Sequence, residues 1–332
     1  MIGRIRKLRK NGVLGINNRN ANYILRYNDR KKYPLVDDKL KTKRLAIDHG
    51  VSVPGLLTHI DSDSQAKDIA SVLEPFPDFV IKPAQGAGGD GILVIQATHK
   101  NRYIKTSGQA VTEKEMQHHC SNVLAGLFSL GGHRDVILVE ERIRPSRVFE
   151  KIAYQGVPDV RVIVFKGFPV MAMLRLPTRQ SQGKANLHQG AIGAGVEISN
   201  GITTQGVWFN DVTMTHPDTG NQLSGLQLPF WDDILELSAR CYEMTDLGYL
   251  GVDIVIDDER GPLMLELNAR PGLNIQIANQ VGLLQRLQKI EREFLYCKPL
   301  RAALSVDERL EYIRDQFGPV STEPPGTAAA DV

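Results

Sequence analysis

Residues 251–272, GVDIVIDDERGPLMLELNARPG, predict a β-hairpin that carries acidic side chains on one face. Two alternating apolar runs, VDIVI and LMLELN, flank the turn-forming residues DERG. A four-residue loop over 258–261 would pair Asp257 with Pro262. Counting back along both strands from that pair then places Asp253 opposite Glu266. Side chains opposed in this way have Cβ atoms roughly 4.5–5.5 Å apart.

A third polar side chain joins this pair of carboxylates. Glu266 and Asn268 are two residues apart and share a face of their strand, whereas Leu265 and Leu267 are expected to point into a core. Opposed carboxylates repel each other unless a proton or cation lies between them, and hard oxygen ligands suit magnesium or manganese. The pattern therefore predicts a metal site at Asp253, Glu266 and Asn268, with a solvated acidic hairpin as the alternative.

Composition and length set the broad class of the protein. The 332 residues suggest about two domains, and 40 Lys and Arg against 38 Asp and Glu indicate neither nucleic acid nor a membrane surface as a partner. Three widely spaced cysteines argue for a reducing compartment. The sequence has no hydrophobic signal core, and no apolar run approaches the roughly 20 residues of a membrane span. We therefore expect a cytoplasmic protein.

The start of the chain is strongly basic. Residues 1–44 hold fourteen Lys and Arg against three Asp. A basic amphipathic helix, a Gly/Asn-rich loop and a second short helix are expected over the first thirty or so residues. Two hypotheses remain open for this segment: a structural helix that packs Ile2, Ile5 and Leu8 on the body, and a surface that binds an acidic acceptor or partner.

The remaining chain alternates helical and strand-like patterns. Helices are expected over 36–50, 63–73, 113–127, 229–247 and 275–294. Strands are expected over 79–82, 92–97 and 136–143, two more within 160–178, and another near 196–199. The Pro/Gly/Ala-rich end, residues 318–332, is expected to be disordered. These patterns suggest a basic segment over 1–37 and two subdomains over 38–145 and 146–317.

A glycine-rich loop follows the strand FVIK. Gly86, Gly88 and Gly91 match G-x-G-x-x-G, but the β-branched run ILVIQA follows where a dinucleotide-binding fold requires a helix. No P-loop sequence occurs. A protein kinase is also excluded, because the lysine precedes the glycines and Glu140 stands where that family needs Asn. The loop instead predicts an amide-rich flap that wraps a polyphosphate above Lys82, with a purely structural glycine hairpin as the alternative.

Several motifs, taken in chain order, resemble the ATP-grasp superfamily and within it the RimK-type ligases that attach glutamate to a carboxylate. The resemblance covers roughly residues 38–279 and implies an α+β fold, in which two α/β subdomains hold the nucleotide between two antiparallel sheets. DKLKTKR, FVIKPAQGAGGDG, VEERI, DVR and NLHQGA are similar to the family's nucleotide-binding segments. The residues so placed around ATP are Lys39, Lys82, Gly86, Gly88, Gly89, Gly91, Glu140, Glu141, Ile143, Asp159 and Asn186.

The same resemblance maps Asp253, Glu266 and Asn268 onto the family's magnesium ligands. It implies an ATP-dependent ligase that activates a carboxylate as an acyl phosphate and joins it to an amine, with Arg175 or Arg270 stabilising the reacting groups. RimK-type ligases carry a full domain before the first lysine motif, so the acceptor and the amine are not implied. The short N-terminus is most similar to sugar-transfer-associated members. The alternatives are an ATP-grasp kinase that phosphorylates a sugar or polyol, and a nucleotide-binding module without turnover.

Overall fold

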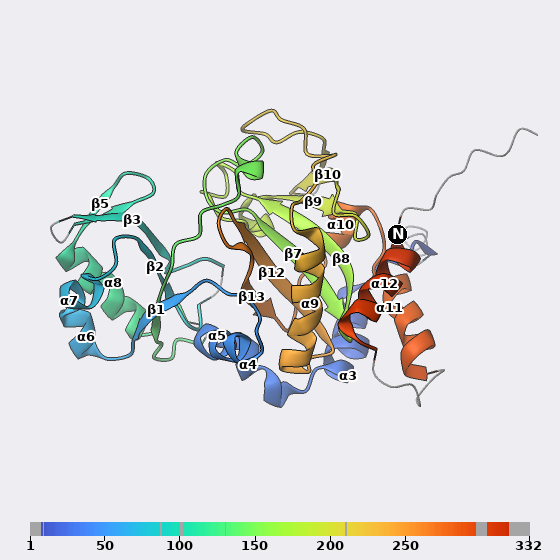
Figure 1. The fold of residues 1–332 in the computed structure, drawn as a ribbon, viewed down its shortest axis with the longest axis horizontal. Coiled ribbons are helices and arrows are strands. Elements are labelled where there is room, and N and C mark those ends of the chain that lie inside the picture. Colours follow the sequence, from blue (N-terminus) through green and yellow to red (C-terminus); the bar gives the residue numbers. More distant parts are fainter. Residues whose placement is uncertain are drawn as a thin grey trace, which may run out of the picture.

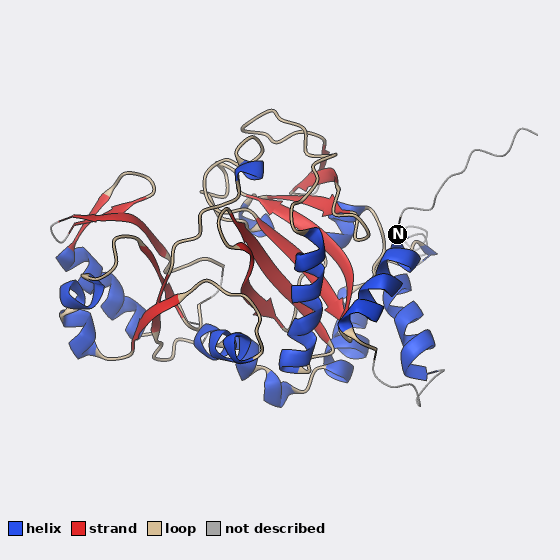
Figure 2. Cartoon of the chain, viewed as in Figure 1, coloured by secondary structure: helices blue, strands red, loops and turns tan. Residues whose placement is uncertain are grey.

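The computed structural model describes residues 8, 10–86, 88–99, 102–129, 131–209, 211–296 and 304–318. It contains two antiparallel sheets, each in its own subdomain, with helices packed around them (Figures 1 and 2). Residues 1–7 and 9 of the basic start lie outside the described residues, as does the tail 319–332 for which disorder was expected.

The smaller subdomain is built on a six-stranded sheet of order β1-β6-β2-β3-β4-β5. Its strands are β1 Leu56–Ile60, β2 Phe79–Pro83, β3 Leu93–His99, β4 Arg102–Lys105, β5 Ala110–Thr112 and β6 Ile137–Glu140. Helices α6 Asp63–Lys67, α7 Ile69–Leu73 and α8 Glu113–Leu124 pack beside this sheet (Figure 1). Helix α8 starts with a capping box in which Thr112 and Glu115 satisfy each other's backbone N–H groups.

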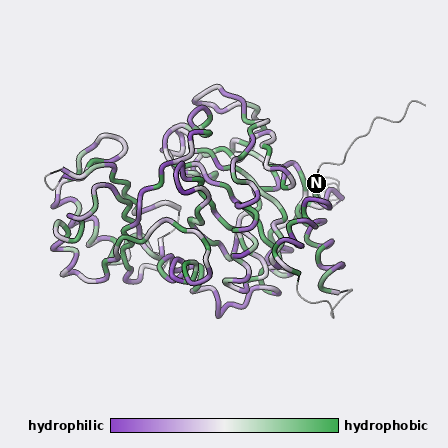
Figure 3. The backbone as a smooth tube through the Cα atoms, viewed as in Figure 1, coloured by the Kyte–Doolittle hydropathy of each residue, from purple (hydrophilic) through white to green (hydrophobic). Residues whose placement is uncertain are grey.

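The larger subdomain is built on a seven-stranded sheet of order β11-β10-β9-β8-β7-β12-β13. Its strands are β7 Asp159–Phe165, β8 Phe168–Leu176, β9 Ile192–Val196, β10 Thr203–Trp208, β11 Asp211–Thr213, β12 Tyr249–Asp257 and β13 Gly261–Asn268. Its helices are α9 Trp231–Thr245, α10 Ile275–Asn279, α11 Leu284–Ile290, η5 Glu291–Tyr296 and α12 Val306–Phe317, with short 3-10 turns η3 Arg147–Phe149 and η4 Leu187–Gln189. Hydrophobic stretches, drawn in green, run through both subdomains (Figure 3).

Helices α4 Pro34–Asp37 and α5 Lys39–Asp48 lie at the junction of the two subdomains. Asp38 caps α5, since its carboxylate accepts from the backbone N–H groups of Leu40 and Lys41. Ala46 belongs to the core of the larger subdomain, whereas Leu40 packs with Ala84 and Leu138 of the smaller one. Helix α5 therefore contacts both halves, and the predicted boundary at residue 38 stays a prediction.

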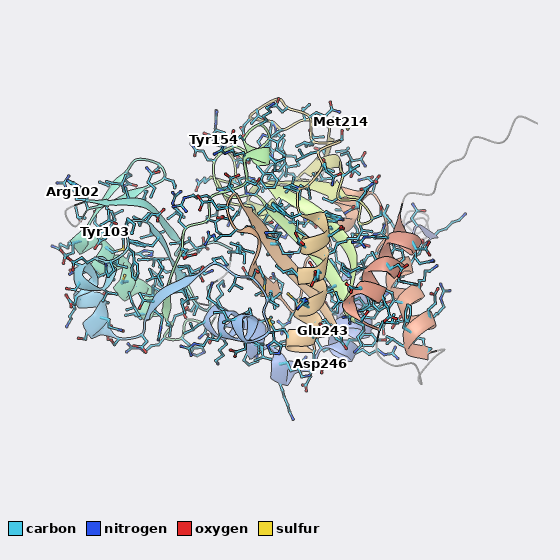
Figure 4. All side chains as sticks on the ribbon, viewed as in Figure 1. Arg102, Tyr103, Tyr154, Met214, Glu243 and Asp246 are labelled. Atoms are coloured by element: carbon cyan, nitrogen blue, oxygen red, sulfur yellow. The ribbon has the colours of Figure 1, made fainter. Side chains whose placement is uncertain are left out.

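The described part of the N-terminal segment packs on the larger subdomain. It forms α2 Ile16–Asn18, the π-helix η1 Arg19–Ile24, α3 Leu25–Tyr27 and the 3-10 helix η2 Arg30–Lys32. The rings of Tyr23 and Tyr27 contact Phe165 of β7 edge-on, at centroid distances of 5.6 and 5.1 Å. Lys32 forms an ion pair with Asp246, which is labelled in Figure 4. These contacts join residues 10–32 to the larger subdomain. The expected packing of Leu8 on the body is wrong, since Leu8 is exposed, and Ile2 and Ile5 lie outside the described residues.

Some predicted elements differ from the observed ones. The strand expected over 196–199 is wrong, because β9 runs from Ile192 to Val196 through two glycines. A Cβ at Gly195 would lie 2.7 Å from the carbonyl oxygen of Ala278, so the close approach of α10 excludes a side chain there. The single helix expected over 275–294 is also wrong. It is interrupted at Gln280, whose φ of +52° is left-handed.

Candidate functional site

The hairpin pairs Asp253 with Glu266, as predicted. The predicted pairing of Asp257 with Pro262 is wrong, since Asp257 pairs with Gly261 and Pro262 pairs with Ile256. Gly261 adopts a φ of +71°, which favours glycine and closes the turn one residue earlier than expected. A bulge between the Ile254 and Asp253 positions then restores the predicted register.

Leu265 is the extra residue of this bulge. It is half-buried and lines a cleft together with Met264 and Glu266, so the expectation that Leu265 points into the core is wrong. Leu267 is buried in the core, as expected. The bulge therefore places an apolar side chain and an acidic one next to each other on the cleft.

Three lysines face β13 across this cleft. Lys39 and Lys43 come from α5 and Lys82 from β2, and the cleft is completed by Val36, Thr42, Val53, Met264, Leu265, Glu266 and Leu267. Lys39 donates to the carbonyl oxygen of Gly86 at the start of the glycine loop. Burial lowers the pKa of Lys39, although the charge of Glu266 opposes this effect. The cleft thus combines ammonium groups with an apolar wall.

The carboxylate of Glu140 holds two of these lysines. Its oxygens lie 3.0 Å from Nζ of Lys43 and 2.7 Å from Nζ of Lys82, and all three side chains are buried. Burial lowers the pKa of Lys43 to about 8, against the opposing charge of Glu140. The side chain of Glu140 therefore organises the lysines.

The hinge that follows Glu140 is tied to the hairpin turn. Glu141 donates its backbone N–H to the carbonyl of Gly55 at 2.9 Å, and its carboxylate forms an ion pair with Arg260. Arg260 also donates to the carbonyl oxygen of Arg142 at 3.1 Å. Ile143 is half-buried in this stretch. Adenine binding by Glu140, Glu141 and Ile143 stays a prediction.

Two aspartates and two arginines form a closed network on the large sheet. Asp159 of β7 pairs with Arg175 of β8, and Arg161 of β7 pairs with Asp253 of β12. Arg175 donates to Asp159 at 2.6 Å and lies 2.8 Å from Asp253, which also receives both contacts from Arg161.

Burial has opposite outcomes for the two aspartates of this network. It raises the pKa of Asp159, and the guanidinium of Arg175 does not offset the effect. Burial also acts to raise the pKa of Asp253, but Arg161 and Arg175 outweigh it, so the pKa of Asp253 lies below its usual range. Both carboxylate oxygens of Asp253 are therefore held by guanidinium groups, and metal binding by Asp253 stays a prediction.

The donor set fits a hard divalent cation. Asn268 lies beside Asp253, with its Nδ2 3.4 Å from Oδ2, and Glu266 faces the same pair from β13. Two carboxylates and an amide oxygen suit Mg²⁺ or Mn²⁺. Within the described ranges no group of three or more His, Cys, Asp and Glu side chains is placed to hold a metal. The metal site at Asp253, Glu266 and Asn268 stays a prediction.

The glycine loop reaches the opposite subdomain. Gly88, Gly89 and Gly91 all have positive φ, and a Cβ at Gly88 would lie 3.9 Å from the side-chain nitrogens of Asn186 and Gln189. Asp90 of this loop forms an ion pair of 2.9 Å with Lys184. The loop therefore lies against residues 184–189 of the larger subdomain.

Arg270 lies beside the cleft. Its guanidinium stands 5.0 Å from the centre of the Tyr33 ring, and its charge acts on Asp37, the residue that precedes the capping Asp38. Arg175 is buried between Asp159 and Asp253, whereas Arg270 is exposed. The catalytic roles predicted for both arginines stay predictions.

Residues 18–292 match the model of the sugar-transfer associated ATP-grasp family. The chain belongs to this family. The match covers both sheets, the glycine loop and the acidic hairpin, so the two antiparallel sheets around the cleft are those of an ATP-grasp fold. It also includes η1 and α3 of the N-terminal segment, which are therefore part of the ATP-grasp unit.

Curated relatives of this ATP-grasp protein are described as probable alpha-L-glutamate ligases. The one from Xanthomonas campestris pv. campestris (strain B100) is 25% identical over 236 residues, which are 71% of this chain and 58% of the relative. The one from Parasynechococcus marenigrum (strain WH8102) is 25% identical over 260 residues, which are 77% of this chain and 41% of the relative. The chain thus spans about half the length of these relatives.

Solved structures of ATP-grasp ligases are more distant. D-alanyl-alanine synthetase A from Vibrio cholerae aligns with a TM-score of 0.47 at 10% identity, covering 80% of this chain and 66% of that one. D-alanine–D-alanine ligase from Bacillus anthracis aligns with a TM-score of 0.43 at 12% identity, covering 86% and 70%. Among the residues that the structure describes, no helix combines the length and apolar character needed to cross a membrane.

The structure adds three site residues to those predicted for the ATP-grasp protein. Lys43 follows Lys39 by four residues on α5, and this helical spacing could have revealed a shared face. Arg161 follows Asp159 by two residues in the segment DVR, and this strand spacing could have revealed a shared face. Arg260 lies in the hairpin turn, and no local pattern indicates that it pairs with Glu141 of the hinge.

Proposed function

We propose that this ATP-grasp protein is an ATP-dependent ligase that joins a carboxylate to an amine and releases ADP and phosphate. The observation that carries the proposal is the cleft itself, in which Lys39, Lys43 and Lys82 face the hairpin of Asp253 and Glu266. A triphosphate needs cations on one side and metal-binding carboxylates on the other. The naming of the relatives as probable glutamate ligases supports a carboxylate acceptor.

Different residues around the cleft are proposed to bind different parts of ATP. The three lysines neutralise the phosphate charge, and the amide groups of the glycine loop cover it. Leu265 and Met264 provide the apolar wall for the base beside the hinge, and Asp159 is proposed for the ribose. Asp253, Glu266 and Asn268 would hold magnesium, which withdraws electron density from the phosphate oxygens when it is bound.

The proposed reaction has two steps. An acceptor carboxylate oxygen attacks the γ-phosphorus, the bond to the bridging oxygen breaks, and ADP leaves. The amine then attacks the carbonyl carbon of the acyl phosphate, inorganic phosphate departs and an amide forms. Positioning and charge neutralisation carry such reactions. Arg175 or Arg270 is proposed to stabilise the transferring phosphoryl group.

The exposed basic residues of the N-terminal segment are proposed to contact an acidic acceptor. Arg30 and Lys31 are exposed, whereas Lys32 is engaged with Asp246. Such contacts are screened over a Debye length of about 8 Å at physiological salt. Acceptor affinity should therefore fall with salt more than ATP affinity does, and replacing Arg30 and Lys31 with Ser should remove this dependence.

The reaction is tested by measuring ADP release while amino acids are crossed with carboxylate acceptors, with products identified by mass. Amide product together with ADP and phosphate is expected, and hydroxylamine should trap the acyl phosphate. Glu266→Gln should abolish turnover with an unchanged circular dichroism spectrum, because it removes a metal ligand's charge at nearly constant shape. Pyrophosphate release would reject the ligase assignment, and a stable phosphorylated alcohol without amide would establish a kinase.

A further inference from the structure

A buried asparagine of the N-terminal segment bridges the two strands that carry the proposed metal ligands. Asn28 is 4% exposed and follows α3. Its Nδ2 donates to the carbonyl oxygens of Tyr249 at 2.7 Å and Ala269 at 3.1 Å, and its Oδ1 accepts the N–H of Tyr249 at 2.8 Å. Only an amide side chain offers the two donors and the acceptor that these three contacts need.

These contacts lie at the end of the hairpin that is opposite its turn. The ladder of β12 and β13 ends with Gly251 paired to Asn268, and Ala269 is the next residue along the chain. Tyr249 begins β12 on the same side. The side chain of Asn28 therefore continues the ladder beyond its last backbone pair, and holds the two strands together where Asn268 must be placed.

The turn after Asn268 is held by the same segment at two more points. Arg19 of η1 donates to the carbonyl oxygen of Pro271 at 2.7 Å, and Tyr33 lies under the guanidinium of Arg270. Each residue from Ala269 to Pro271 is thus contacted by the N-terminal segment. The backbone of this turn fixes the direction in which the side chains of Asn268 and Arg270 leave it.

We propose that Asn28 is a positioning residue for the metal site, acting through the backbone of Ala269 on the ligand Asn268. The inference rests on the proposed function, since it presumes that the hairpin binds a divalent cation with nucleotide. Loss of the outer partners of metal ligands typically weakens metal binding 10–100-fold. Because Asn28 acts through one peptide unit, a loss of about tenfold in affinity is expected.

The test compares Asn28→Asp with Gln276→Glu. Asn28→Asp keeps the shape and the acceptor but removes the donor to Tyr249 and Ala269. Gln276 is a second buried amide joining the same segment to the large subdomain, with contacts to Leu14 at 2.8 and 3.1 Å and to Leu283 at 2.9 Å. Its replacement disturbs the same interface without touching the turn. Asn28→Ser provides a milder variant if the aspartate prevents folding.

The measurement is Mn²⁺ affinity in the presence of ADP, from the electron paramagnetic resonance signal of free Mn²⁺, with the melting temperature of each variant recorded alongside. Asn28→Asp should bind Mn²⁺ about tenfold more weakly, whereas Gln276→Glu should lose melting temperature but keep its affinity. Equal affinities for Asn28→Asp and wild type, or equal losses in both variants, would overturn the positioning role. If Glu266→Gln binds Mn²⁺ as tightly as the wild type does, that result would instead refute the metal site and with it the proposed function.

Discussion

Replacing Glu140 with Gln should destabilise the nucleotide-free protein and make its stability depend on bound phosphate. The Glu140 carboxylate is buried between Lys43 and Lys82, at 3.0 and 2.7 Å from their ammonium groups. Removing one partner of a buried ion pair leaves uncompensated charge and costs about 3–5 kcal/mol. In a chain of 332 residues each kcal/mol corresponds to roughly 1.5 °C, so the melting temperature should fall by roughly 5–7 °C.

A polyphosphate can replace the missing negative charge. Addition of ADP should therefore raise the melting temperature of Glu140→Gln by more than it raises that of the wild type, because ligand stabilisation grows with affinity. Glu141→Gln is the matched control, since its carboxylate is half exposed and pairs with Arg260 at the surface, where ion pairs contribute at most about 1 kcal/mol. Both are measured by differential scanning fluorimetry with and without ADP. Equal melting temperatures for the two variants without nucleotide would refute the role of Glu140.

Three further predictions concern the lysines and the glycine loop. Lys82→Ala should weaken ATP binding at least about tenfold, since a charge-assisted contact contributes roughly 1.5–3 kcal/mol, and wild-type affinity in calorimetric titration would exclude a phosphate contact. Burial lowers the pKa of Lys43 in the folded protein to about 8, from 10.5 in the unfolded chain. The free-energy cost of burying the charged ammonium group is therefore fully present below pH 8 and disappears as the pH rises towards 10.5. The wild type should therefore gain roughly 2 kcal/mol in unfolding free energy relative to Lys43→Met between pH 7.5 and 10, measured by urea denaturation, and parallel pH profiles would contradict this. Asp90→Lys replaces the ion pair between Asp90 and Lys184 with two like charges, so it should speed ADP release in stopped-flow measurements. Adding Lys184→Asp to this variant should restore the slower rate. Additive effects of the two changes would show that the pair does not hold the loop closed.

The pairing of Asp253 with Glu266 was predictable from the sequence, but for an incomplete reason. Strand alternation and turn composition located the hairpin, and two local deviations then compensated each other: the turn closes one residue early at Gly261, and the bulge at Leu265 adds the residue back. Sequence alternation does not reveal a bulge, since the extra residue has the same apolar character as its neighbours. For that reason Leu265 was placed in the core when it lines the cleft.

The role of the N-terminal segment was not predictable from its charge. Its basic residues dominate the composition, yet the residues that join it to the body are Tyr23, Asn28 and Leu14, which are buried. Several of their partners stand more than two hundred positions away in the chain, as with Asn28 and Ala269. No local periodicity can report such contacts, because they depend on how distant strands pack. Local patterns predicted most helices and strands and the motif resemblance implied the fold, whereas the support of the site depends on tertiary contacts.

The ties around the hairpin turn define how the two halves can move. Asp258 donates its N–H to the carbonyl of Arg144, Met264 donates to Ser52, and Asp257 forms a bridge with Pro145. The two connecting segments, at Ser52 and at Arg144 and Pro145, are thus both held to the same hairpin by backbone contacts. If the small subdomain rotates, we expect the pivot to lie at this hairpin, because both connections between the subdomains are held there. The end of the cleft next to the hairpin would then keep its width, and the glycine loop would move furthest.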